Sequence, residues 1–146
     1  MTEDKKTSEQ YLDLYKLAVE MADRVSARRA TANAFFLTVN TALLAFVSSN
    51  SLNVLWLVAL AGIALSVAWW MLLKSYRELN GAKFSVINEM ENNLEVRVFN
   101  KEWEILKTNR PPGWRGKYAE LGTVERVVPL IFAALYVAVF VKALLS

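Results

Sequence analysis

The sequence predicts an all-α integral membrane protein with three transmembrane helices and a helical cytoplasmic region. Three stretches are almost purely apolar and about as long as a membrane is thick. Apolar residues make up 55% of the chain, above the roughly 45–50% typical of soluble domains. No alternating strand pattern is longer than 96–99, which favours helices throughout. With 146 residues, of which 21% are charged, we expect one membrane domain, 1–146, lying partly in water.

An amphipathic pattern predicts a cytoplasmic helix over residues 8–32. Apolar side chains recur there at helical spacing: Tyr11, Leu14, Tyr15, Ala18, Ala22 and Val25. No Gly or Pro separates this helix from a first span at 33–49, so we expect one continuous helix of roughly 40 residues. Its apolar stripe must be buried against other parts of the protein. The candidates are the segment 76–94, Trp103 with Leu106, and other subunits.

An uncharged connection, 48–53, joins the first span to a second span at 54–73, so the two spans should be antiparallel neighbours. The second span has about 20 residues without a charge, enough to cross the hydrocarbon layer. Small residues inside it permit close helix–helix approach: Ala61, Gly62, Ala64 and Ser66. Three aromatic side chains near its ends are expected as membrane-interface anchors: Trp56, Trp69 and Trp70.

A cytoplasmic helical segment, 74–122, should follow the second span. Asn80-Gly81 is expected to break its helical pattern locally. A shorter helix is predicted at 101–107, and Pro-Pro-Gly makes 108–114 a turn or loop. A third span is predicted at 124–145.

The distribution of Lys and Arg predicts the direction of the spans. Of 17 such residues, six lie in 1–32, ten in 74–126 and one after 141, while 48–53 has none. Segments rich in Lys and Arg next to a membrane span favour the cytoplasmic side, so we expect the N-terminus inside and the C-terminus outside. The polar start of the chain is unlike a signal peptide, so the first span should be retained as an anchor.

Polar side chains mark one stretch of the first span: Asn33, Thr38, Asn40 and Thr41. Asn33 and Asn40 are seven residues apart and share a helical face. Amides in lipid require partners, so this face should meet protein or water. Three interpretations remain open: polar contacts between helices, the lining of a water-filled pore in an oligomer, and a ligand site.

Charged residues mark the cytoplasmic boundary of the membrane. Arg28 and Arg29 are expected to bind anionic lipid headgroups. Pairing with Glu125, at the base of the third span, is the sharper alternative. That ion pair would hold the first and third spans together at one depth.

The composition argues against catalysis. The chain has no His and no Cys, which removes the commonest metal ligands and general bases. Several carboxylates remain, and we interpret them as solvated: Glu89, Glu91, Glu95, Glu102 and Glu104. We therefore expect no enzyme and no catalytic, cofactor or metal site. The net charge of +3 is too small and dispersed to indicate nucleic-acid binding.

Five strings of residues form a recognisable pattern: Tyr11-x-x-x-Tyr15-Lys16, Met21-Ala-Asp-Arg-Val-Ser-Ala-Arg-Arg29, Thr31-Ala-Asn-Ala-Phe-Phe-Leu-Thr-Val-Asn40, Glu102-Trp103 and Tyr118-x-x-Leu121-x-x-x-Glu125-x-x-x-Pro129. By these strings most of the chain, from Tyr11 to about Tyr136, resembles the bacterial RipA-type octameric membrane proteins. The resemblance implies a small multi-pass protein of the bacterial cytoplasmic (inner) membrane that assembles as a homo-octamer. Family members have been linked to growth inside host cells. No established catalytic activity, and hence no functional residue, comes with it.

These observations favour a non-enzymatic homo-oligomer, an octamer by the resemblance, that acts as a scaffold or regulatory platform with a cytoplasmic ring. The alternative is an oligomeric channel lined by the Asn/Thr face of the first span. Expected partners are other copies of the chain, membrane lipids and an unidentified cytoplasmic protein.

Overall fold

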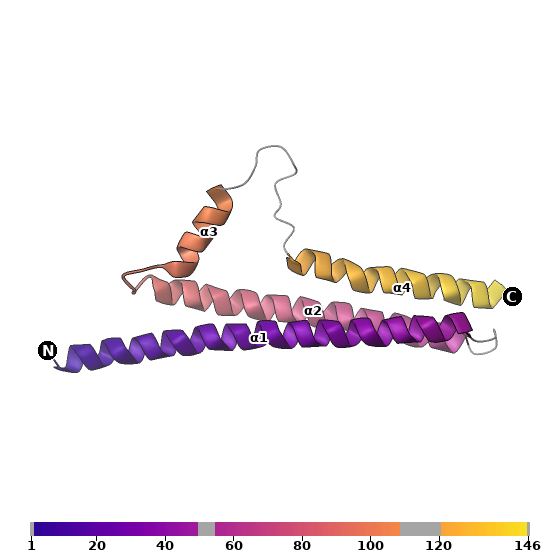
Figure 1. Ribbon diagram of the computed structural model, residues 1–146, viewed down its shortest axis with the longest axis horizontal. Helices are drawn as coiled ribbons and strands as arrows, with labels where there is room; N and C mark the ends of the chain where they lie inside the picture. Colours follow the sequence, from indigo (N-terminus) through magenta and orange to yellow (C-terminus); the bar gives the residue numbers. More distant parts are fainter. Residues whose placement is uncertain (1, 50–54, 109–120, 146) are drawn as a thin grey trace. The chain divides into compact units, whose positions relative to one another are not determined.

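The computed structural model describes residues 2–49, 55–108 and 121–145, and all regular secondary structure in these ranges is helical. The helices are α1 (Thr2–Ser49), α2 (Leu55–Glu91), α3 (Val98–Thr108) and α4 (Leu121–Leu145) (Figure 1). Three of them, α1, α2 and α4, contain stretches long and apolar enough to cross a membrane. The predicted all-α class with three candidate spans is confirmed. The tip of the predicted hairpin, 50–53, and most of the predicted 108–114 loop lie outside the described residues.

The first helix is continuous, as the sequence predicted. It runs for 48 residues without a break between its polar and apolar parts. The absence of Gly and Pro explains this continuity, because no residue in the helix lacks an N–H donor or has the backbone freedom that favours a break.

The second helix differs from the prediction. α2 extends from Leu55 to Glu91 and passes through Asn80-Gly81 without a break. A glycine inside a helix costs only about 1 kcal/mol relative to alanine. Packing on the same helix, including the buried Ile87, offsets a penalty of that size. The local break expected at Asn80-Gly81 is therefore wrong, and the span bounds 54–73 within this longer helix stay a prediction.

Contacts group the chain into two compact units, which are described separately. Unit 1 comprises Met1–Ala27 and Glu78–Tyr118, and unit 2 comprises Arg28–Arg77 and Ala119–Ser146. The two long helices, α1 and α2, each contribute one part to both units. Unit 2 holds the predicted spans, whereas unit 1 holds the part of the chain predicted to lie in the cytoplasm.

Unit 2 is a three-helix assembly of α1, α2 and α4. Asn33 and Asn40 of α1 contact Trp69 and Ser66 of α2, respectively, so these helices are antiparallel. Asn40 also contacts Tyr136 of α4. Arg29 of α1 pairs with Glu125 of α4, so the order of these two contacts along both helices makes α4 parallel to α1, as three consecutive spans require.

Unit 1 packs α1 and α3 against α2. Ala22 of α1 and Ile87 of α2 are buried. Phe84 of α2 and Phe99 of α3 meet edge to face, with ring centroids 5.6 Å apart. Aromatic pairs of this geometry stabilise by about 0.5–1.5 kcal/mol beyond the area they bury. This small apolar centre positions the polar groups that join the three helices.

Candidate functional site

Asn40 is the centre of a polar cluster in unit 2. Its side chain is completely buried, at 0% exposed. The amide nitrogen donates to the carbonyl oxygen of Phe36 at 2.8 Å, and the amide oxygen accepts from the hydroxyl of Ser66 at 3.3 Å. The backbone oxygen of Asn40 accepts from the hydroxyl of Tyr136 at 2.8 Å. One residue thus connects α1 to both α2 and α4, and each polar atom of its amide has a partner.

Asn33 makes the second contact of this cluster. Its amide oxygen accepts from the indole N–H of Trp69 at 3.0 Å. The Trp69 ring stacks on Phe36, with centroids 5.9 Å apart and planes at 7°, and lies 6.0 Å from the ring of Phe132. A polar tip bonded inside an apolar cage is the arrangement that a buried tryptophan requires.

The three tryptophans predicted as membrane-interface anchors fall into different environments. Trp69 is only 1% exposed, so its ring cannot reach lipid headgroups. Its bond to Asn33 explains the difference from the prediction, since the indole N–H finds a partner inside the unit. Trp56 is exposed and Trp70 is half-buried, so both remain available as anchors.

The predicted Asn/Thr face of the first span divides into two sides of α1. Asn33 and Asn40 point at α2, as described above. Thr38 and Thr41 are exposed, and their hydroxyls donate to the carbonyl oxygens of Ala34 and Leu37 in the same helix. The structure therefore brings the two amides together with α2 and leaves the two hydroxyls on another side.

An ion pair joins α1 and α4 at the charged boundary. Arg29 Nε lies 3.6 Å from Glu125 Oε2, and both side chains are mostly shielded from solvent. Arg28 is exposed and lies outside this ion pair. Of the two arginines that the sequence offered as partners for Glu125, the structure selects the one on the α4 side of α1.

Glu91 forms the polar centre of unit 1, which the sequence did not predict. This residue ends α2, and its carboxylate is completely buried. The backbone N–H groups of Phe99 and Asn100, in the first turn of α3, donate to its two oxygens at 2.9 and 3.2 Å. The hydroxyl of Tyr15 donates to the same carboxylate at 2.9 Å. A carboxylate at the start of a helix satisfies free N–H groups and complements the helix dipole.

The electrostatics of Glu91 follow from these contacts, which lie outside the predicted spans. Burial raises the pKa of the Glu91 carboxyl, but the hydrogen bonds from Phe99, Asn100, Tyr15 and Val98 outweigh burial and hold the pKa below its ordinary value of 4.5. Burial, and then the bond to Glu91, raise the pKa of Tyr15 to about 12. Near neutral pH the carboxylate is charged and Tyr15 is a donor.

Tyr11 completes the contact between α1 and the end of α2. Its hydroxyl donates to the carbonyl oxygen of Met90 at 2.8 Å and accepts from the side-chain amide of Asn93 at 3.0 Å. The Met90 carbonyl is one of those that the helix end leaves without an intrahelical donor. The spacing of Tyr11 and Tyr15, one helical turn apart, is the only sequence signal that could have indicated this pair of contacts.

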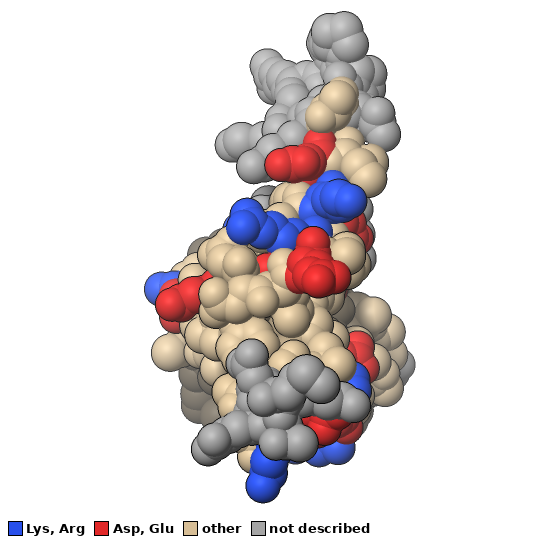
Figure 2. Space-filling model, turned by 90° about the vertical axis from the view of Figure 1, so that its left-hand side faces the viewer, with Lys and Arg blue, Asp and Glu red and all other residues tan. Residues whose placement is uncertain are grey.

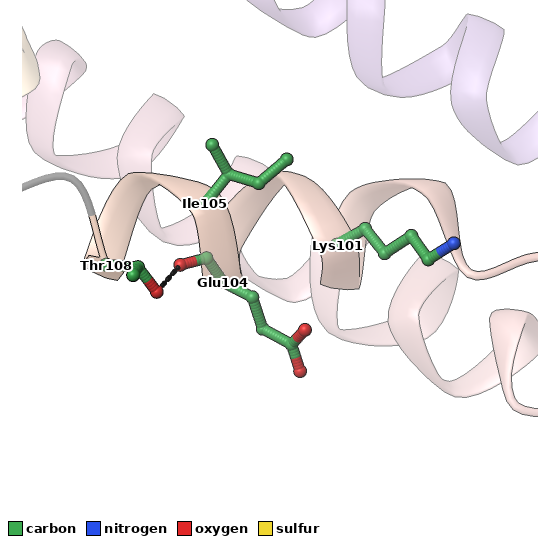
Figure 3. A pocket seen from close by; sticks show the side chains of 4 residues that line it. All are labelled: Lys101, Glu104, Ile105 and Thr108. Carbon is green, nitrogen blue, oxygen red and sulfur yellow. Dashed lines mark hydrogen bonds between the residues drawn. The ribbon is translucent and has the colours of Figure 1, made fainter.

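The depression on α3 is not a built ligand site. A shallow depression on α3 is lined by Lys101, Glu104, Ile105 and Thr108, whose side chains point in different directions (Figure 3). Its one internal hydrogen bond joins the Thr108 hydroxyl to the Glu104 carbonyl at 2.8 Å. On the face drawn in Figure 2, Lys and Arg alternate with Asp and Glu, so no patch of one sign forms there. Among the described residues, no three His, Cys, Asp or Glu side chains gather as metal ligands.

Comparison with known proteins decides the family. The model of the octameric membrane protein family (8xMP) matches residues 12–145, which is nearly the whole chain. The chain belongs to the octameric membrane protein family. The resemblance drawn from the sequence is thereby confirmed. No curated protein and no solved structure matches the chain. Membership in the octameric membrane protein family makes the chain a membrane protein and indicates that it associates with copies of itself.

Proposed function

We propose that the protein is a homo-octameric scaffold or regulatory platform of the bacterial inner membrane, with unit 1 of each copy contributing to a cytoplasmic ring. One observation carries this proposal. Polar side chains at several helix contacts bond inside the protomer, as Asn40 and Glu91 illustrate. What the protomer presents outward includes many large apolar side chains, from Leu14 in unit 1 to Val137 in unit 2. Such a surface suits association with lipid and with other copies.

The proposed orientation places the N-terminus in the cytoplasm and the C-terminus outside. It rests on the sixteen Lys and Arg residues in 1–32 and 74–126, against none in 48–53. A reporter that is active only in the cytoplasm, fused to Ser146, should be inactive. Strong activity would contradict the orientation, and the same reporter fused to Met1 is the control that should be active.

The absence of catalysis is part of the proposal. Glu91 is the most shielded carboxylate of the described residues that carry charge, and its oxygens already accept three hydrogen bonds. A carboxylate held in that way is a poor general base, because its lowered pKa makes it a weak proton acceptor and its lone pairs are occupied.

A channel has weaker support than a scaffold. The amides of Asn33 and Asn40, the strongest polar groups of the first span, contact α2 and not an outer surface. Only the hydroxyls of Thr38 and Thr41 remain on an exposed side, and each is bonded to its own helix.

One experiment separates the two functions. The purified protein is weighed in detergent by native mass spectrometry and then reconstituted in liposomes for ion flux. A scaffold gives the mass of eight chains and no flux. A monomer contradicts the proposal. Flux that Thr38→Val together with Thr41→Val abolishes, while the octamer persists, would favour the channel.

A further inference from the structure

An apolar strip of α1 lies exposed in unit 1. Sequence periodicity assigned Leu14 to the inward stripe with Tyr11 and Tyr15, but Leu14 is 57% exposed. Leu17 and Met21 are exposed on the same helix, at 51% and 46%. These three side chains follow at i, i+3 and i+7, the spacing of one helix face. The face of α1 that packs inside unit 1 is therefore narrower than predicted. Next to it lies a second apolar face of the same helix, formed by these three exposed side chains.

α2 carries a matching strip. Leu79 and Val86 are exposed, seven residues apart, and Val86 immediately precedes the buried Ile87. Leu14 and Met21 likewise immediately precede inward residues of α1, Tyr15 and Ala22. Two antiparallel helices run in opposite directions. The residue just before an inward residue of one helix therefore lies on the same side of the contact as the residue just before an inward residue of the other. The two strips therefore form one face.

The register of the two helices makes this face contiguous. Tyr11 contacts Met90 and Tyr15 contacts Glu91, so residue numbers at one level of the pair add up to about the same value. The sums are 101 and 106, so Leu14 with Val86 and Met21 with Leu79, which each sum to 100, lie near one level but are displaced along the axis by roughly 1.5–9 Å. The five exposed apolar side chains on this side cover about two turns of both helices. We refer to them as the lateral face: Leu14, Leu17, Met21, Leu79 and Val86.

Lipid does not suit the lateral face. The exposed residues of α1 around this face include charged ones, with ion pairs between Lys16 and Asp13 and between Arg24 and Glu20. Along α1, Met21 precedes the predicted span by roughly 18 Å, at about 1.5 Å per residue. An apolar face at that distance lies in water unless protein covers it.

We infer that the lateral face is the surface through which unit 1 of one copy docks on a second copy of this chain. The inference rests on the proposed homo-octamer and adds the residues that build its contact. The occupant is a second copy because the family is octameric and because an apolar centre bordered by charged residues is the usual composition of a subunit interface.

Charge substitution tests the docking surface. Met21→Glu and Val86→Glu place a carboxylate in the lateral face from each helix. Both side chains are exposed in the protomer, so the helical content measured by circular dichroism should stay unchanged. Native mass spectrometry in mild detergent should show the octamer replaced by smaller species. Val96→Glu is the matched control, because Val96 is equally exposed outside the lateral face, and it should remain octameric. Octamers for both face variants would overturn the inference.

Cysteine protection tests the same surface without adding charge. The natural chain has no cysteine, so Met21→Cys, Val86→Cys and Val96→Cys each carry one thiol. In the intact octamer a water-soluble maleimide should label the control at least tenfold faster than the two face variants. Dissociation should remove the difference. Equal labelling within an octamer overturns this inference alone, whereas a monomeric wild type overturns it together with the proposed function.

Discussion

The hydroxyl of Tyr136 donates a hydrogen bond of 2.8 Å to the backbone carbonyl of Asn40, and both residues are completely buried. The bond joins the third predicted span to the first at the residue whose side chain also contacts the second. Tyr136→Phe removes this one donor and keeps the ring. We expect a loss of about 1 kcal/mol or less in the free energy of unfolding.

Thermal unfolding in detergent, followed by circular dichroism, measures that loss. Thr38→Val is the control, since the Thr38 hydroxyl is exposed and bonds only to its own helix. A Tyr136→Phe variant as stable as wild type would show that this hydrogen bond contributes nothing to the packing of α4.

The two helical glycines of α2 should respond oppositely to alanine. A Cβ at Gly62 would lie 2.5 Å from the ring of Tyr136, whereas a Cβ at Gly81 meets nothing within 4 Å. Because the Tyr136 ring is completely buried, it cannot move aside without cost. We expect Gly62→Ala to destabilise by about 1–3 kcal/mol and Gly81→Ala to stabilise by about 0.5–1 kcal/mol.

Unfolding temperatures of Gly62→Ala and Gly81→Ala, each compared with wild type, test these two predicted stability changes. The same sign of change at both positions would contradict the close approach of α2 and α4 at Gly62.

Stability should depend on pH through Glu91. Its pKa in the folded protein is below the ordinary 4.5, so its contribution is complete above that value and is lost as the pH falls through the folded pKa. Glu91→Gln should be less stable than wild type at pH 7, and the difference should shrink as the pH is lowered below 4.5. Glu95→Gln, which changes an exposed carboxylate of the same region, is the matched control.

We expect a second loss of stability, at alkaline pH, when Tyr15 loses its proton. Its pKa is raised from 10.0 to about 12, so its contribution is complete below pH 10 and disappears as the pH rises through about 12. Tyr15→Phe removes the titrating group. Melting curves of this variant should therefore lack the part of the alkaline transition that Tyr15 causes in wild type.

The ion pair of Arg29 and Glu125 should contribute modestly. At 3.6 Å, with both side chains partly exposed, we expect a coupling of less than about 1 kcal/mol. A double-mutant cycle with Arg29→Gln and Glu125→Gln measures it. The parallel cycle with Arg28→Gln should give no coupling, and equal coupling in both cycles would mean that the two arginines share Glu125.

Sequence patterns were sufficient for the parts of the fold that depend on composition along one chain. The long α1, the three candidate spans and the absence of strands in the described residues follow from apolar runs and from where Gly and Pro occur. Asn80-Gly81 misled the prediction because a local propensity of about 1 kcal/mol is smaller than the packing of a helix on its neighbours.

Contacts between helices were less predictable, for a different reason. Periodicity identified Asn33 and Asn40 as one face, but only the position of α2 determines that Trp69 and Ser66 are their partners. Glu91 was interpreted as solvated because five glutamates in one region look alike in a sequence. Its burial depends on α3 returning to it, and no spacing rule relates residue 91 to residues 99 and 100.

The carboxylate of Glu91 has a consequence for how this chain can vary. It belongs to the last residue of α2 and binds the first turn of α3, so the two ends of the link 92–97 are held by one side chain. An inserted or deleted residue in that link would rotate or shift the start of α3 and remove its N–H groups from the carboxylate. Sequences that share this arrangement should therefore keep both a carboxylate at this position and the number of residues that follows it, while side chains within the link other than Asn93, which binds Tyr11, can change.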